Sequence, residues 1–379
     1  MPGPSIMFVA GDPSGDQHAS RVLKRLTAIL PDVRCFGIGG LAMQSEGFEP
    51  LLPFEEFNRM GIVEVLAHLP FFLKAKRKLI AAMDEQKPRV LVCVDYPGLN
   101  IGLLREAYKR KIPVVWYIVP QVWAWKKKRA ATLGNLASFI GAVFPFEVDF
   151  FKQYPAPISF VGHPLIEALQ EKLKPVLLGI QKTGRRRLSL VPGSRRQEVL
   201  AMLPIMVTAA KLLTRRYPDL SVAISKCRGL QQELYQKACG ETAFEIIEGP
   251  LGDLLDQTDV AFVTSGTATL ETALAGVPMV IAYRTSRVTY ALLKRMVRVT
   301  FIGLPNIIAG EKIVPECIQH DANAENLAAV MTPFIDSEEL CRATEAKLLR
   351  LKDVLGSKTP SEEIARAIVE LINPPASAV

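Results

Sequence analysis

Short apolar runs alternate with longer stretches of helical spacing along all 379 residues of the chain. The runs are rich in Val, Ile and Phe and do not alternate strictly with polar residues, which is typical of parallel strands covered on both faces. They lie at residues 6–10, 34–38, 90–94, 114–118, 139–144 and 158–161, and again at 188–191, 222–225, 244–247, 260–263 and 279–283. Helical stretches such as 16–30, 69–85 and 198–216 separate them. The pattern predicts an α/β protein with two doubly wound, Rossmann-like domains.

The two series of strands divide the chain into three predicted parts. A seam follows Gly162-His-Pro164, so we expect one α/β domain at residues 1–166 and another at 167–350. The remaining residues, 351–379, are expected to form a helical tail.

The tail region shows two amphipathic helical patterns, the first at 336–355. The second begins at Thr359, which is a suitable N-cap, with Pro360 at the first helical position and Glu362 closing a capping box. Its apolar stripe must be buried against something. The stripe consists of Ile364, Ala365, Ile368, Val369 and Ile372. We expect it to pack on the first domain or on a partner subunit, as in a homodimer.

Composition places the chain among globular proteins, because 49% of its residues are apolar and 22% are charged. The six cysteines form no CxxC pair, so we expect reduced thiols rather than disulfides or a zinc site. The longest uncharged run, 130–146, is short for a membrane span and is broken by Gly134 and Pro145. The N-terminus lacks the pattern of a signal peptide, and we therefore expect a cytoplasmic protein.

The formal net charge of +8 is concentrated in a few places. Basic clusters lie at 74–78, 126–129, 185–187, 195–196 and 294–298. Each alone is most simply a solvated helix face. Together they indicate an anionic partner, which is a nucleic acid, a phosphate-bearing substrate or an acidic lipid.

Ligands of open α/β sheets collect in the loops after the carboxyl ends of strands. The first such loop is Ala10-Gly-Asp-Pro-Ser-Gly-Asp16, in which Ser14 can cap a helix that begins near residue 16. It matches neither GxxxxGK[ST] nor GxGxxG, so no P-loop is expected.

In the second loop, Asp95 ends a buried strand. Hydrophobic surroundings can raise its pKa into the range of a general base, although a turn-capping role is the alternative. Asn100 can cap the next helix.

Two further loops in the second domain suggest an anion site. In Pro192-Gly-Ser-Arg-Arg-Gln-Glu198, Ser194 and Gln197 have capping-box spacing, which puts Arg195 and Arg196 in the first helical turn. The helix dipole disfavours cations there unless an anion binds between them and the exposed amides.

The other loop follows the run at 260–263. Ser265, Gly266 and Thr267 can form a second phosphate cradle at a helix start. Glu271 lies one helical turn beyond Thr267 and could accept hydrogen bonds from a ribose, or it is an ordinary exposed helical glutamate.

Several other features are open to two interpretations. Residues 37–42 satisfy GxGxxA but follow the second strand, so a dinucleotide fingerprint is unexpected. His163 lines a cleft or has a structural role. The segment 60–78 joins apolar residues to a basic run, as interfacial membrane segments do, but it also fits a core helix with a solvated end. The aromatic and basic stretch 115–129 is more typical of core or cleft wall than of nucleic-acid binding.

Taken in order, eight motifs resemble those of the lipid-A-disaccharide synthase family of glycosyltransferases. The likeness runs from residue 10 to about residue 316. The motifs are A-G-D-P-S-G-D (10–16), M-G-I-V-E-V-L (60–66), V-P-Q-V-W-A-W-K-K-K-R (119–129), F-P-F-E (144–147), F-V-G-H-P (160–164), P-G-S-R (192–195), S-G-T-A-T-L-E (265–271) and L-P-N-I-I-A-G-E (304–311).

The resemblance implies a glycosyltransferase-B fold, with two Rossmann-like domains facing a cleft. It implies an inverting transfer of 2,3-diacylglucosamine from UDP to 2,3-diacylglucosamine 1-phosphate (lipid X), which forms a β-1,6 disaccharide and releases UDP. It further implies a peripheral enzyme on the inner face of the cytoplasmic membrane, held by acidic lipids, that needs no metal or cofactor and binds no nucleic acid. The segment 60–78 would then contact acyl chains and membrane.

Carried over by position, the resemblance implies that Asp95 would be the catalytic base. The substrate-binding residues would be Asp12, Ser14, Ser194, Arg195, Ser265, Gly266, Thr267, Glu271 and Asn306. The family usually has Glu where this chain has Asp12, and Ala where it has Pro13. Its D-x-P-D-F-N motif appears here as Asp95-Tyr-Pro-Gly-Leu-Asn100, without the second acid. The alternatives are a UDP-GlcNAc 2-epimerase, another lipid glycosyltransferase that uses a UDP-sugar, and more distantly a nucleic-acid-binding protein.

Overall fold

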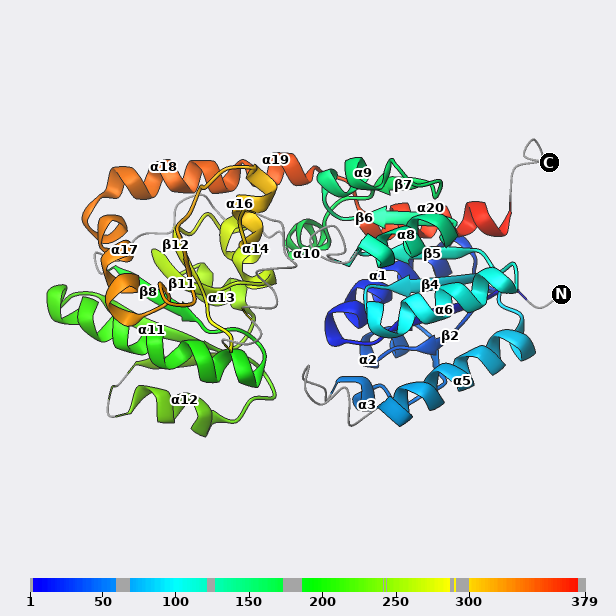
Figure 1. The fold of residues 1–379 in the computed structure, drawn as a ribbon, viewed down its shortest axis with the longest axis horizontal. Coiled ribbons are helices and arrows are strands. Elements are labelled where there is room, and N and C mark those ends of the chain that lie inside the picture. Colours follow the sequence, from blue (N-terminus) through cyan, green and yellow to red (C-terminus); the bar gives the residue numbers. More distant parts are fainter. Residues whose placement is uncertain are drawn as a thin grey trace. The chain divides into compact units, whose positions relative to one another are not determined.

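The computed structural model describes residues 3–58, 69–120, 127–172, 186–240, 242, 244–286, 290 and 300–373. The chain falls into two units, of which unit 1 comprises Met1–Lys172 with Leu355–Val379 and unit 2 comprises Leu173–Val354. Each unit has a parallel β-sheet of its own (Figure 1). The predicted α/β class with two doubly wound sheets is confirmed.

The sheet of unit 1 has the strand order β3-β2-β1-β4-β5-β6-β7. The strands are β1 (Ser5–Ala10), β2 (Arg34–Ile38), β3 (Glu49–Pro50), β4 (Val90–Val94), β5 (Val114–Tyr117), β6 (Phe139–Ala142) and β7 (Ile158–Phe160). All but β3 lie at predicted apolar runs. β3 is a two-residue edge strand of exposed residues, Glu49 and Pro50, and therefore leaves no hydrophobic pattern in the sequence.

Helices cover both faces of this sheet. They are α1 (Pro13–Ile29), α2 (Leu41–Gln44), α3 (Glu55–Asn58), α5 (Leu69–Gln86), α6 (Pro97–Lys109), α8 (Lys127–Leu136), α9 (Pro145–Phe151), α10 (Pro164–Lys172) and α20 (Pro360–Ile372). Helices α5, α6 and α8 bury one face in a core with Leu79, Leu103 and Leu133. On the other face, α1 packs beside α20, which also contacts β4, β5 and β6 (Figure 1).

Helix α20 is the predicted tail helix, and unit 1 buries its apolar stripe. Ile364 and Ile368 are fully buried. The Ser361 hydroxyl donates to the buried Glu167 carboxylate, and the Arg89 guanidinium donates to the Ile372 carbonyl at 2.9 Å. The predicted cap is wrong in one detail: Thr359 is the N-cap residue, but its side chain accepts no capping hydrogen bond.

The sheet of unit 2 has the strand order β10-β9-β8-β11-β12-β13. The strands are β8 (Arg187–Val191), β9 (Ser221–Lys226), β10 (Glu245–Glu248), β11 (Val260–Thr264), β12 (Met279–Tyr283) and β13 (Glu316–Ile318). Its helices are α11 (Arg196–Arg216), α12 (Gln232–Cys239), α13 (Leu251–Leu255), α14 (Thr267–Leu274), α16 (Leu304–Ala309), α17 (Ala324–Asp336) and α18 (Glu338–Leu349). A short helix, α19 (Leu351–Leu355), follows α18.

The region predicted as one helix at 336–355 is helical from Glu338 but is divided in two. Arg350 separates α18 from α19, and the end of α17 is separated from α18 by Ser337. This residue has extended backbone angles, and its hydroxyl accepts the Leu340 amide at 3.1 Å as the N-cap of α18. The amphipathic pattern continues across this break, and periodicity alone therefore merged the end of α17 with α18 and α19.

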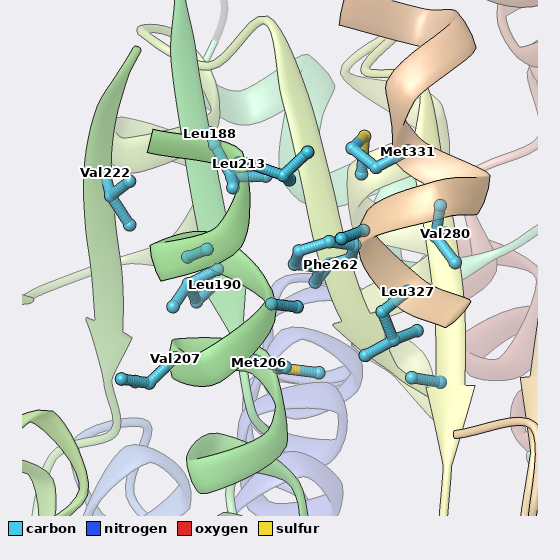
Figure 2. Packing of buried hydrophobic residues seen from close by; sticks show 14 of the residues in the cluster. Leu188, Leu190, Met206, Val207, Leu213, Val222, Phe262, Val280, Leu327 and Met331 are labelled. Carbon is cyan, nitrogen blue, oxygen red and sulfur yellow. The ribbon is translucent and has the colours of Figure 1, made fainter. Parts of the chain in front are cut away.

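Helix α11 contributes much of the unit 2 core. Figure 2 shows Met206, Val207 and Leu213 of this helix among side chains of β8, β9 and β11, which include Leu190, Val222 and Phe262. Among the described residues, α11 alone is long and apolar enough to cross a membrane by length and composition. Its buried residues belong to this core, which accounts for that composition.

Candidate functional site

The loop after β1 is closed by Asp12. Its carboxylate accepts the Gly15 amide at 2.7 Å and so caps α1, which begins at Pro13. The predicted cap Ser14 is therefore wrong, because the helix starts three residues earlier than expected. Ser14 lies within the first turn, where its hydroxyl meets Nε2 of His18 at 3.0 Å.

In the GxGxxA stretch, the backbone amides at the start of α2 donate to the side chain of Asp16. This carboxylate, on α1, accepts the amides of Gly40 at 2.7 Å, of Met43 at 3.1 Å and of Ala42 at 3.1 Å. Those amides belong to the N-terminus of α2, where a dinucleotide would place its pyrophosphate. Because an internal carboxylate satisfies them, the expectation that this stretch is no dinucleotide fingerprint agrees with the structure.

Asp95 lies in a strained turn at the end of β4. Asp95 and Tyr96 have φ angles of 42° and 47°, in the left-handed region that non-glycine residues seldom occupy. The Tyr96 ring lies over Gly11, where a Cβ atom would stand 2.6 Å from the ring. Two loops of unit 1, after β1 and β4, therefore meet at a glycine. Consecutive residues of this kind cluster at functional sites.

Asn100 stabilises this turn through hydrogen bonds of its side chain. The prediction that it caps the helix is wrong. Helix α6 begins at Pro97, so Asn100 lies inside it and is fully buried. Its amide nitrogen donates to the Asp95 carbonyl at 2.8 Å and to the Val9 carbonyl at 3.3 Å. Its side-chain oxygen is buried without a hydrogen-bond partner.

The surroundings of Asp95 suit a proton acceptor. Burial raises the pKa of this carboxyl to about 7, and the nearby negative charge of Asp12 contributes further. The side chain is half-buried and thus still reaches solvent. A carboxylate with this pKa is partly ionised at neutral pH and is a stronger base than an ordinary aspartate.

His163 has a structural environment. It is buried, its Nδ1 accepts the Leu165 amide at 3.1 Å, and its ring packs against Phe144 at 5.1 Å between centroids. Burial lowers the pKa of His163 to about 3, and the nearby His18 lowers it further. The imidazole is therefore neutral at physiological pH.

In unit 2, Glu198 rather than Gln197 completes the turn after β8. Helix α11 begins at Arg196, with Arg195 as its N-cap residue, one position later than the Ser194–Gln197 spacing predicted. The Glu198 carboxylate accepts the amides of Ser194 at 3.1 Å and of Arg195 at 3.2 Å, and it pairs with the Arg195 guanidinium at 2.9 Å. The side chain of Arg195 is 80% exposed.

The loop after β11 starts α14 as predicted. Gly266 is the N-cap residue and Thr267 the first helical residue, and both are exposed. The Ser265 hydroxyl donates to the Ile302 carbonyl at 2.9 Å, so this hydroxyl is engaged within the protein. Glu271 is half-buried on α14, with a carboxylate oxygen 3.9 Å from the position of a Cβ atom built on Gly252 of α13.

Asn306 holds a loop of unit 2 and is itself fully buried. Its oxygen accepts the amides of Ile313 at 2.8 Å and Val314 at 3.0 Å, while its nitrogen donates to the Val314 carbonyl at 2.9 Å. That nitrogen also donates to Glu316 at 2.8 Å. The Asn306 side chain thus uses its hydrogen-bonding groups within the protein in this structure.

Glu316, at the start of β13, joins Asn306 to the loop that Ser265 contacts. Its carboxylate accepts the amides of Ile302 at 2.9 Å and Gly303 at 3.0 Å. Ser265 and Asn306, both predicted site residues, are therefore joined by one hydrogen-bonded network within unit 2.

A family model described as lipid-A-disaccharide synthetase matches residues 6–369. The chain is 37% identical to the lipid-A-disaccharide synthase of Geobacter sulfurreducens, with 97% of each chain covered. It is 33% identical to that of Myxococcus xanthus, with 98% of each covered. The chain belongs to this family. It is accordingly a glycosyltransferase of lipid A biosynthesis, as the eight motifs suggested.

Solved structures show the same fold at low sequence identity. The glycotransferase of kitacinnamycin matches with a TM-score of 0.65 and 16% identity, covering 98% of this chain and 100% of that one. A UDP-GlcNAc 2-epimerase from Neisseria meningitidis matches with a TM-score of 0.63 and 14% identity, covering 97% and 98%. These likenesses establish the glycosyltransferase-B fold, while the family assignment rests on the synthase relatives.

Some of the motifs that suggested the family lie partly or wholly outside the described residues. These are the stretches 60–66 and 119–129, the latter being described only at its two ends. The basic cluster at 294–298 also lies outside them. Among the described residues, no group of three or more His, Cys, Asp or Glu side chains is arranged to hold a metal ion.

Three side chains at the candidate site were not among the residues predicted from the sequence. Tyr96, over Gly11, carried no sequence signal. Glu198 carried one, because it stands three residues after Arg195, the same capping-box spacing that Gln197 has from Ser194. Thr264, at the end of β11, is only 2% exposed and its hydroxyl has no hydrogen-bond partner, which only the packed structure reveals.

Proposed function

We propose that this enzyme transfers 2,3-diacylglucosamine from UDP-2,3-diacylglucosamine to the 6′-hydroxyl of 2,3-diacylglucosamine 1-phosphate. The products are the β-1,6 disaccharide 1-phosphate and UDP. Membership of the lipid-A-disaccharide synthase family restricts the reaction class. The observation that carries the mechanism is Asp95, a half-buried carboxyl in a strained turn whose pKa is raised to about 7.

The proposed step is a single displacement at the anomeric carbon of the donor. The acceptor oxygen forms the new bond to this carbon while the bond to the UDP oxygen breaks, and UDP leaves with the electron pair. The hydroxyl proton passes to the Asp95 carboxylate. Attack opposite the leaving group inverts the anomeric centre and gives the β linkage.

Unit 2 carries the groups proposed for the donor. The exposed Arg195 and the amides that precede α11 can neutralise charge that develops on the diphosphate, as can the N-terminus of α14 with Thr267. Glu271 is the proposed ribose acceptor. Ser194 and Gly266 contribute backbone amides, while the buried Asn306 acts through the loop that it fixes.

Disaccharide formation by Asp95→Asn tests the base. Purified protein is incubated with UDP-diacylglucosamine and the lipid monophosphate acceptor, and products are measured by mass spectrometry. We expect turnover to fall by roughly 10²–10⁴-fold, the usual contribution of a general base. Asp32→Asn, which changes an exposed aspartate of the same unit, is the matched control. Near-normal turnover by a folded Asp95→Asn enzyme eliminates Asp95 as the base.

The same assay separates the related activities. The proposed enzyme requires the acylated donor, whereas a UDP-GlcNAc 2-epimerase would act on UDP-GlcNAc without acyl chains. Conversion of UDP-GlcNAc at a rate similar to that of the acylated donor would favour the second reaction.

We also propose peripheral binding to the inner face of the cytoplasmic membrane. Helix α5 exposes Leu73 next to Lys74 and Arg77, an arrangement that suits acyl chains and anionic head groups. Co-sedimentation with anionic vesicles should exceed that with zwitterionic ones, and Lys74→Glu with Arg77→Glu should reduce it. A homodimer stays a prediction, for which light scattering of the purified protein is the test.

A further inference from the structure

The loop after β8 encloses a carboxylate of its own chain. Glu198 Oε2 accepts two consecutive amides, those of Ser194 at 3.1 Å and Arg195 at 3.2 Å, and Oε1 accepts the Arg195 guanidinium at 2.9 Å. Gly193 makes this approach possible. A Cβ atom there would lie 2.5 Å from Oε2, and its φ of +104° disfavours other residues.

These partners are the ones that a phosphate oxygen prefers. Adjacent backbone amides before a helix, together with an arginine, form a common anion site. Here the negative charge is already present, because the side chain of Glu198 supplies it. Only 21% of that side chain is exposed, whereas Arg195 is 80% exposed, so the arginine faces solvent while the carboxylate lies inside the loop.

Other groups place this carboxylate among the strand ends of unit 2. Burial raises the pKa of Tyr283, at the end of β12, and the Glu198 charge adds to this effect. The same holds for the pKa of Cys227, directly after β9. The carboxyl ends of parallel strands are where ligands bind in such sheets.

A second observation at this edge concerns the hydroxyl of Thr264. The Thr264 hydroxyl is buried, with 2% of the residue exposed, and has no hydrogen-bond partner. Val263 pairs with Val191, so Thr264 stands beside the first residue of the loop that holds Glu198. Alternation along β11 puts it on the same face as Phe262, which packs in the core formed with α11 (Figure 2).

We infer that Glu198 occupies the diphosphate position of the donor site, so that UDP must displace its carboxylate from Ser194 and Arg195 in order to bind. This inference rests on the proposed function of unit 2 as the UDP-sugar site. In the absence of UDP the carboxylate keeps the loop amides satisfied and the loop preformed. After transfer, its return to the same amides favours the release of UDP.

Glu198→Gln tests the displacement, because glutamine keeps an oxygen for the loop amides and removes the negative charge. UDP, UMP and uridine are titrated by calorimetry into the full-length wild type, Glu198→Gln and Glu339→Gln. The last variant makes the same change at an exposed glutamate of unit 2. We expect Glu198→Gln to bind UDP on the order of tenfold more tightly, as removal of one close like charge implies, and uridine with unchanged affinity.

The outcomes separate the two proposals. If wild type binds UDP but Glu198→Gln binds it equally or less tightly, the carboxylate is a permanent part of the loop and the displacement is wrong. If wild type binds no UDP, the proposed donor site is itself wrong, and the displacement falls with it.

A measurement on wild type keeps the inference testable if the variant does not fold. In the NMR spectrum, inorganic pyrophosphate should shift the Glu198 carboxyl carbon together with the amides of Ser194 and Arg195. Shifts of the two amides without any change at the carboxyl carbon would show binding that leaves Glu198 in place, and would overturn the inference.

Discussion

At the scale of single residues, Asp95 combines an unfavourable backbone conformation with an unfavourable charge. Its φ of 42° is sparsely populated, and burial opposes ionisation of its side chain. Both costs persist because neighbours over-determine the turn: Asn100 holds the Asp95 carbonyl, and the Tyr96 ring is seated on Gly11. The aspartate is thereby kept close to the pKa that proton transfer at neutral pH requires.

The pH dependence of transfer should report this carboxyl. Because the base must be deprotonated, kcat/KM should fall as the pH drops below about 7, the raised pKa of Asp95. Asp12→Asn removes the charge that contributes to this raised pKa, while its side-chain oxygen can still accept the Gly15 amide. The acidic limb of Asp12→Asn should therefore move to lower pH. An unmoved limb, with Asp32→Asn as control, would mean that another group controls the profile.

Removal of the Asp95 charge should also stabilise the fold. A pKa raised from 3.8 to about 7 means that the folded state loses stability as the pH rises through this interval. Asparagine carries no charge and tolerates a positive φ better than most residues. Thermal unfolding should thus give Asp95→Asn a higher Tm than wild type at pH 8, with a smaller difference at pH 5. An equal difference at both pH values would exclude the charge as its cause.

At the scale of elements, the sequence predicted strands better than helix starts. Buried parallel strands are continuous apolar runs, so β2, β4 and β12 were predicted residue for residue. Helix starts depend on which of several polar residues caps the first turn. The sequence predicted Ser14 as the cap of α1, but the cap is Asp12. It predicted a capping box of Ser194 and Gln197 for α11, but the structure has Arg195 and Glu198 in these positions. Local spacing fits both choices, and only the packed loop distinguishes them.

The candidate site was predictable to the level of loops rather than of contacts. Residues 12, 95, 195 and 265–267 lie where parallel strands end, as predicted. Asn306 is buried and donates to Glu316, which in turn holds the loop at Ile302 that Ser265 contacts from 37 residues away. No local pattern encodes such a link.

Glu316 should stiffen the loop next to the proposed donor site. The Ile302 amide donates to one oxygen of Glu316, and Gly303 and Asn306 donate to the other. In Glu316→Gln an NH₂ group replaces one of these oxygens and faces its donors, which should cost roughly 1–3 kcal/mol of unit 2 stability. We expect faster hydrogen exchange at Ile302 and Gly303 and weaker UDP binding. Glu325→Gln, at an exposed position on α17, provides the control. Unchanged exchange at both amides would contradict the proposed role.

At the scale of the whole molecule, unit 1 is discontinuous in sequence. The last strand of its sheet is β7, and α20, which packs on this sheet, follows in the sequence only after all of unit 2. The apolar stripe of α20 was visible in the sequence, whereas its partner was not, since a stripe shows that burial is needed and does not identify the surface. The structure identifies that surface as α1 with β4, β5 and β6.

Truncation of one α20 side chain should therefore destabilise unit 1. Ile368 is fully buried, and Ile368→Ala should cost about 2–5 kcal/mol through lost burial and the cavity left behind. Hydrogen exchange followed by mass spectrometry should show faster exchange in β4, β5 and α1. Val354→Ala, a change at a side chain that is 44% exposed, should have little effect. Equal protection in Ile368→Ala and wild type would show that α20 does not contribute to the stability of unit 1.

The late position of α20 has a consequence for synthesis on the ribosome. At about 5–20 residues per second, translation of Leu173–Val354 takes roughly ten to forty seconds. During that interval the nascent unit 1 has its sheet and α1 but lacks α20, so the apolar surface that this helix later covers remains open. A chaperone that binds nascent apolar surface would find its site here, and the arrival of α20 would end that interaction.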